Sequence, residues 1–129
     1  MSEEVIKDMI EKLVSRVYEL DLEVLESLVD IKLYSSCSSA RWHLFWGIRN
    51  LDWDEVKKAY VPCAIAMIIH EIWDAKFHEK QITDFDKVKF MQYFTLVLSP
   101  IEYDKVAKEV LEELEWSISI ARRGIIKKK

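Results

Sequence analysis

Apolar residues recur every three or four positions along most of this chain, which is the spacing of amphipathic helices. The segment 3–19 shows this spacing most clearly, and its opposite face is charged or polar. Its apolar positions are Val5, Ile6, Met9, Ile10, Leu13, Val14, Val17 and Tyr18. The pattern predicts a helix with one buried face.

The longest apolar run extends from Val61 to Ile69 and opens a segment that continues to Phe77. A helix that is apolar on every side is satisfied only when other elements surround it. We therefore expect residues 61–77 to form a buried central helix. Pro62 lacks a backbone donor and crowds the preceding turn, so it either kinks a helix that begins near Trp53 or starts a new one.

Helix-start and helix-stop signals divide the rest of the chain. The candidate N-caps are Asp21, Asp52 with Glu55, Thr83 with Asp86 (or Asp84 alone), and Ser99 with Pro100 and Glu102. Gly124 predicts the end of the last helix. Residues 22–50 fit either one helix or two, and we expect one that is irregular at its serines, since serine side chains compete for the backbone.

Composition agrees with long helices rather than strands. Of the 129 residues, half are hydrophobic and a third are charged, and only two are glycine and two proline. Many short strands would require more turn residues. We predict an all-α fold, a compact bundle of five to six helices around the buried segment 61–77, with a single domain at 1–124 and a basic tail at 125–129.

Charge and targeting signals point to a soluble cytoplasmic protein. The net charge of −4 gives no overall attraction to nucleic acid or anionic lipid. No apolar run approaches the roughly 20 residues of a membrane span, and the acidic start does not resemble a signal peptide. The scarcity of Asn and Gln beside abundant Glu and Lys is typical of thermophile proteins.

Two cysteines occur outside any motif. Cys63 lies in the apolar run, where it is expected to act as a small buried side chain. A disulfide between Cys37 and Cys63 is compatible with the sequence, which does not determine the geometry.

An aromatic and basic stretch is the first candidate site. Trp42, Trp46, Arg49 and Trp53 lie near one helical face, while Leu44 and Ile48 lie on another. Two apolar faces on one helix indicate either deep burial or a second contact surface. Large aromatic residues commonly fill a core, but exposed Trp and Arg form hot spots of protein interfaces and also stack on unpaired bases.

A nucleic-acid surface would need further positive charge. The candidates are Arg41, Arg122, Arg123, Lys127, Lys128 and Lys129. A basic tail of this kind can bind phosphates weakly, or it can simply be a solvated end of the chain.

A metal site is the third candidate. His70, Asp74 and His78 recur at intervals of four, so neighbouring pairs share a helical face. Imidazole and carboxylate at this spacing suit Zn²⁺ or another transition metal. The simpler interpretation is a hydrogen bond between His70 and Asp74 with His78 in solvent.

One family resemblance is carried by residues 39–44 through Asp52, by Ala59 and Tyr60, and by residues 64–72. These segments resemble the paired long helices of HEPN-type bundles over less than a third of the chain. The ribonuclease motif of that family, an arginine separated from a histidine by four to six residues, is missing. The resemblance therefore implies a helical bundle associated with nucleic acid but without nuclease activity.

The sequence contains no nucleotide-binding glycine loop, nucleophile elbow or Cys-x-x-Cys motif. We predict a non-enzymatic interaction or assembly subunit that needs no cofactor and binds a protein partner or a second copy of itself. Its contact surface is Trp42, Trp46, Arg49 and Trp53, or the first helix paired with a copy of itself. A nucleic-acid-associated protein and a metal-binding protein are the alternatives.

Overall fold

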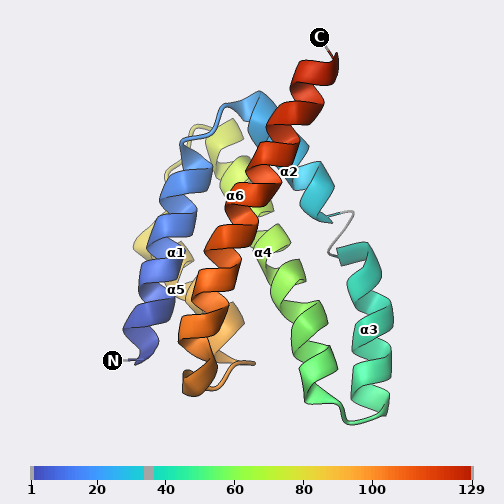
Figure 1. Ribbon diagram of the computed structural model, residues 1–129. Helices are drawn as coiled ribbons and strands as arrows, with labels where there is room; N and C mark the ends of the chain where they lie inside the picture. The colour runs from blue at the N-terminus through green and yellow to red at the C-terminus, as the bar shows by residue number, and fades with distance from the viewer. Residues whose placement is uncertain (1, 34–36, 129) are drawn as a thin grey trace.

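The computed structural model describes residues 2–33 and 37–128, without the side chains of 2, 38, 39, 41 and 126–128. Within those ranges it contains six α-helices, one 3-10 turn and no strand, so the predicted all-α bundle is confirmed (Figure 1). The elements are α1 (Ser2–Tyr18), α2 (Leu22–Lys32), α3 (Ser38–Arg49), α4 (Trp53–Phe77), α5 (Asp84–Thr95), η2 (Pro100–Glu102) and α6 (Tyr103–Lys128).

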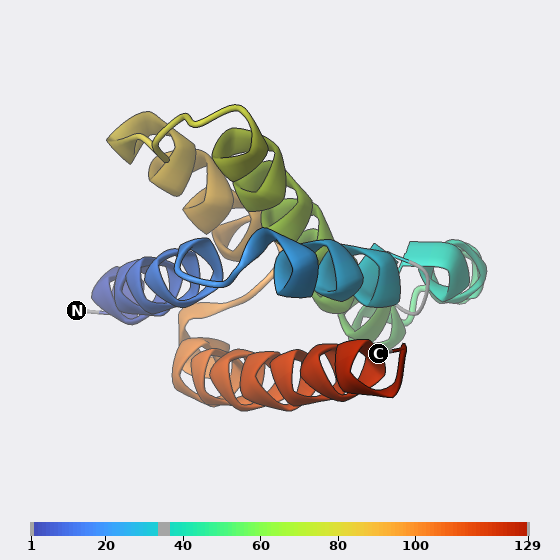
Figure 2. The same cartoon turned by 90° about the horizontal axis from the view of Figure 1, so that it is seen from above.

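Helices α1 and α2 form the middle layer of the bundle. Figure 2 shows α6 on one side of this layer and α4 with α5 on the other, and α1 packs against all three. The apolar stripe expected in α1 is buried at Ile6, Met9, Ile10, Leu13, Val14 and Val17. Full burial of one such side chain contributes about 1.5–3 kcal/mol.

This burial bears on the predicted pairing of the first helix with a second copy. The apolar stripe of α1 is already used by its own bundle, because α4, α5 and α6 cover it. The described side chains of α1 leave no second apolar stripe, so the observed packing offers no free apolar face for that pairing.

Helix α4 runs without interruption from Trp53 to Phe77 and includes Pro62 in its interior, so Pro62 does not begin a new helix. Its Ile65, Ile68, Ile69 and Ile72 are buried, and it packs against α1, α2, α3 and α5. The outward side is open, however, since Met67 and Phe77 are about half exposed. The segment 61–77 is therefore one wall of the core and is not enclosed on every side.

Residues 22–50 form two helices, α2 and α3, in place of the single irregular helix that we expected. Figure 2 shows α2 lying across the view and α3 running nearly along it. The two helices bury their faces against different partners, because α2 packs against α4 and α6 whereas α3 packs on α4. Of the serines expected to be irregular, Ser35 and Ser36 lie outside the described residues.

The helix starts were predicted better than the last helix end. Asp52 accepts a bond from the Glu55 N–H at 3.2 Å, and Thr83 forms a capping box with Asp86. The stop predicted at Gly124 is wrong, because α6 continues to Lys128 and no glycine in the described ranges has a positive φ. A helical glycine costs only about 1 kcal/mol, which is too little to end a helix by itself. Residues 125–128 therefore belong to α6.

Three hydrogen bonds hold the end of α1 against the end of α4. Lys76 Nζ donates to the carbonyl oxygens of Tyr18, at 2.7 Å, and of Leu20. In return the Tyr18 hydroxyl donates to the Lys80 carbonyl oxygen at 3.0 Å. A lysine here satisfies carbonyl groups that a helix leaves unpaired at its C-terminus.

Glu102 joins the start of α6 to α4. Its carboxylate accepts a bond from Lys57 Nζ at 2.7 Å and two more from the Ser99 N–H and hydroxyl, at 3.0 and 2.9 Å. The hydrogen bond from Lys57 is the largest cause, followed by those from Ser99, and together they lower the pKa of the Glu102 carboxyl group from 4.5 to about 2.

We predict that Glu102→Gln lowers the free energy of unfolding by about 1 kcal/mol near pH 7, the upper end for a partly exposed pair. The pKa of Glu102 is lower in the folded than in the unfolded chain, so its contribution is complete above about pH 4.5 and fades as the pH falls toward 2. Urea unfolding at several pH values should show the two proteins converging in acid. Glu109→Gln is the control, since Glu109 lies 4.0 Å from Lys105 in an exposed pair. A Glu102→Gln deficit that is unchanged in acid would contradict the assignment.

Candidate interaction surface

The α3–α4 hairpin, which we define as residues 37–63, lies outside the main core. Among the described residues from 37 to 60, none belongs to the central cluster of buried apolar side chains or packs against it as a partly buried neighbour. In Figure 1 the hairpin projects to one side of the bundle, and Figure 2 shows α3 at the same outer edge. Within the hairpin only its last part reaches the core, where Val61 packs against the cluster as a partly buried neighbour.

Small side chains hold the two helices of the hairpin together. Ala40 and Gly47 of α3 are buried, as are Val56 and Ala59 of α4. A Cβ atom added at Gly47 would lie 2.8 Å from Val56 Cγ2, so only glycine permits this approach.

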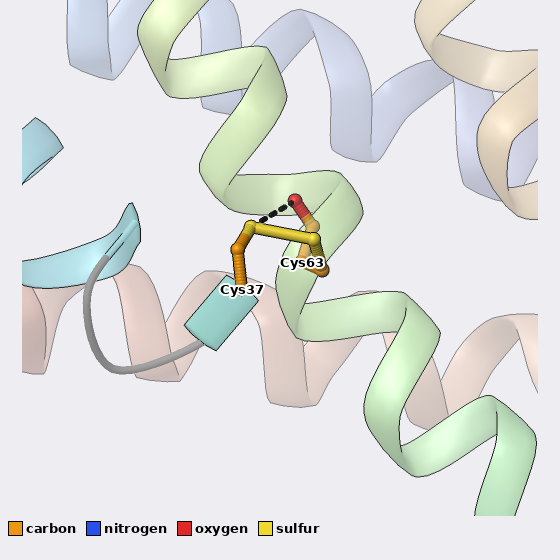
Figure 3. The surroundings of a disulfide bond; sticks show 2 residues. All are labelled: Cys37 and Cys63. Carbon is orange, nitrogen blue, oxygen red and sulfur yellow. Dashed lines mark hydrogen bonds between the residues drawn. A yellow bond between two sulfur atoms is a disulfide. The ribbon is translucent and has the colours of Figure 1, made fainter. Parts of the chain in front are cut away.

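A polar contact and a covalent bond complete the hairpin. His43 Nδ1 lies 2.6 Å from Glu55 Oε1. Figure 3 shows the disulfide between Cys37, just before α3, and Cys63 in α4, whose Cα atoms are 4.8 Å apart. The disulfide that the sequence allowed is thus present. Cys63 is half-buried and bonded, so the expectation that it acts only as a small buried side chain is wrong.

The large apolar side chains of the hairpin point away from its packed side. The exposed fraction is 64% for Trp42, 62% for Trp53 and 75% for Leu51. The Trp46 ring centroid lies 5.5 Å from that of Trp42 and 5.4 Å from that of Phe45, and Arg49 Cζ lies 5.4 Å from the Trp46 ring centroid. We name the whole set the aromatic surface: Trp42, Phe45, Trp46, Ile48, Arg49, Leu51 and Trp53.

All four residues predicted for the interface are therefore exposed, and the alternative in which the tryptophans fill the core is wrong. The reason is that Ala40 and Gly47, rather than the large rings, occupy the side of α3 that faces α4. Sequence reasoning missed Phe45 and Leu51, and it placed Ile48 on a different face from the tryptophans. Phe45 stands three residues after Trp42, a spacing that places both on one helical face.

Leu51 at the tip of the hairpin has an unfavourable backbone. Its φ is +55°, in the left-handed region where a branched side chain is strained. Asparagine adopts this conformation more easily, yet Asn50 stands one position before it. A strained and exposed leucine does not benefit the fold of the isolated chain. Such positions cluster at functional sites.

The predicted metal ligands are exposed on the open side of α4 but do not form a ready-made site. His78 Nδ1 lies 2.8 Å from the Asp74 carbonyl oxygen and 3.5 Å from its carboxylate, while the His70 ring packs 5.7 Å from the Trp73 ring. Among the described residues, no group of three or more His, Cys, Asp or Glu side chains is placed to hold a metal ion.

The predicted basic residues do not gather at the aromatic surface. Arg122 and Arg123 are exposed near the end of α6, and Arg123 Cζ lies 5.6 Å from the Trp116 ring centroid. Figure 1 places the end of α6 and the α3–α4 turn at opposite ends of the molecule. The side chains of Arg41, Lys127 and Lys128 are not among those described, and Lys129 lies outside the described residues.

We predict that Gly47→Ala and Gly124→Ala change stability in opposite directions. Overpacking against Val56 should cost about 1–3 kcal/mol at Gly47. No atom lies within 4 Å of a Cβ at Gly124, so alanine there should add up to about 1 kcal/mol. Urea unfolding of both variants measures the difference. Equal effects at the two glycines would show that the approach of α3 to α4 is not tight.

Leu51→Asn is predicted to stabilise the chain by about 1 kcal/mol, because asparagine adopts the left-handed conformation at lower cost. Glu79→Asn is the matched control, since Glu79 has a φ of +56° in the turn after α4. Thermal unfolding should give a higher midpoint for both variants. A clear loss of stability in Leu51→Asn alone would indicate that the leucine side chain supports the hairpin itself.

Comparisons with known proteins return no relative. No protein-family model matches the chain, and neither a curated protein nor a solved structure matches it. None of the helices in the described ranges has an apolar stretch of the length that a lipid bilayer requires. The geometry of the hairpin is therefore the basis for a functional assignment.

Proposed function

We propose that this chain is a non-enzymatic interaction subunit that binds another protein chain through the aromatic surface of its α3–α4 hairpin. The observation that carries the proposal is the concentration of large exposed apolar side chains on a hairpin that lies outside the core. Contiguous apolar patches on a soluble protein mark interaction sites. Tryptophan and arginine are enriched among the residues that dominate binding energy.

The charges around the tip favour a protein over a nucleic acid. Asp52 and Asp54 are exposed beside Leu51 and Trp53, and their carboxylates repel phosphate groups. Arg49 is the described basic side chain on the aromatic surface, and it already packs over the Trp46 ring. The basic end of α6 is too far from the hairpin to complete a single positive patch.

The proposal includes a cytoplasmic location. A second copy of the chain is the first partner to test. We predict that wild-type protein associates in a concentration-dependent manner in sedimentation experiments. Trp46→Ala should weaken association at least tenfold, because truncating a central tryptophan typically costs 2 kcal/mol or more.

Trp116→Ala is the matched control. Trp116 is exposed, as Trp46 is, and it also lies beneath an arginine, but it belongs to α6. It should leave association unchanged. Equal weakening by both variants would indicate nonspecific association of exposed rings and would contradict the assignment to the hairpin.

The remaining outcomes separate the alternatives. If the wild type stays monomeric, a photo-reactive group at Phe45 should capture a different protein, and Trp46→Ala should abolish that product. Binding of a fluorescent single-stranded oligonucleotide that falls steeply with salt would instead favour the nucleic-acid alternative. A monomer that captures no protein would refute the proposed function.

A further inference from the structure

The disulfide encloses the whole interaction surface. Cys37 immediately precedes α3 and Cys63 lies in α4, so the bond closes a covalent loop over residues 37–63. Every member of the aromatic surface lies inside that loop, and the main core cluster takes no residue from its described part. The bond therefore acts on the hairpin separately from the rest of the bundle.

Apolar burial contributes little to holding α3 on α4. Among the described side chains of α3, only the small residues Ala40 and Gly47 are buried. The helix has 12 residues, and isolated helices shorter than about 12–15 residues are marginal in water. Without a covalent tie before its first residue, α3 is the part of the bundle that opens most easily.

We propose that the Cys37–Cys63 disulfide is a redox switch that fixes α3 on α4 when oxidised and releases it when reduced. Both cysteines are half-buried at the edge of the hairpin rather than enclosed in the core of the bundle. This inference rests on the proposed function for its consequence, because an ordered α3 is what presents the aromatic surface as one rigid patch. Disulfides in a reducing compartment are commonly reversible sensors.

The chemistry is thiol–disulfide exchange with a dithiol reductant. One thiolate of the reductant attacks a sulfur of the disulfide, forms a mixed disulfide and displaces the other cysteine as a thiolate, which takes up a proton. The second thiol of the reductant then displaces the remaining cysteine. Two electrons and two protons pass to the protein, the reductant becomes a cyclic disulfide, and a small disulfide oxidant reverses the reaction.

Amide hydrogen exchange tests the switch without any partner. We predict that dithiothreitol raises the exchange rate of amides in residues 38–49 by on the order of 10²-fold. This is the effect expected when the covalent bond that closes a loop of this size is removed. Amides of α1 and α6 should keep their protection. Cys37→Ser should resemble the reduced wild type and should not respond to dithiothreitol, whereas Ser27→Ala, a substitution on α2, should leave the response intact.

The outcomes distinguish this inference from the proposed function. Equal protection of α3 in the oxidised and reduced protein, or equal loss in every helix, overturns the switch. Sedimentation in both redox states tests the consequence, since association should weaken on reduction. If α3 responds to reduction but no association occurs in either state and no partner is captured, the switch stands and the proposed function fails.

Discussion

Burial of the α1–α2 layer between α6 on one side and α4 with α5 on the other is the constraint on which this structure depends. The stripe from Ile6 to Val17 is covered on both sides of the layer, and Leu25 and Leu28 extend it into α2. This layer, together with isoleucines of α4 and residues of α5 and α6, completes the hydrophobic cluster, and the described residues from 37 to 60 take no part in it. The large rings of this segment can therefore face the solvent without leaving the core incomplete.

The hairpin follows a different packing logic from the bundle. Its inner side uses Ala40, Gly47 and Ala59, which allow two backbones to approach closely, and its outer side carries the rings. Close approach of small residues gives a defined geometry with little hydrophobic stabilisation. The disulfide supplies the missing stability by restricting the open forms of the loop. The hairpin thus keeps the aromatic surface in a defined geometry although none of the large side chains of that surface is buried in the core.

Periodicity and capping chemistry predicted α1 and the starts of α4 and α5, because α1 has a single apolar face and Asp52 and Thr83 offer oxygens to free backbone donors. They did not predict the division of residues 22–50 into two helices. The direction of the tryptophans was not predictable in this way. The side of α3 that is buried carries Ala40 and Gly47 rather than a row of large apolar residues, and it is set by the close packing of Gly47 against Val56, a tertiary contact that no local pattern contains. For the same reason the run Val61–Ile69 could not reveal that Met67 lies on an open side. Gly124 misled because a local preference worth about 1 kcal/mol was read as a stop signal.

The closeness of the two ends of the hairpin has an evolutionary consequence. The hairpin begins at Cys37 and ends at Cys63, and the Cα atoms of these residues are 4.8 Å apart. The hydrogen bonds from Lys76 to the carbonyl oxygens of Tyr18 and Leu20 hold the neighbouring part of the bundle independently of the hairpin. Segments whose ends meet are the ones that domains exchange most readily by insertion. A lineage can therefore replace or lengthen the recognition surface without changing the central cluster of the bundle, provided that Val61, which packs against that cluster, is kept.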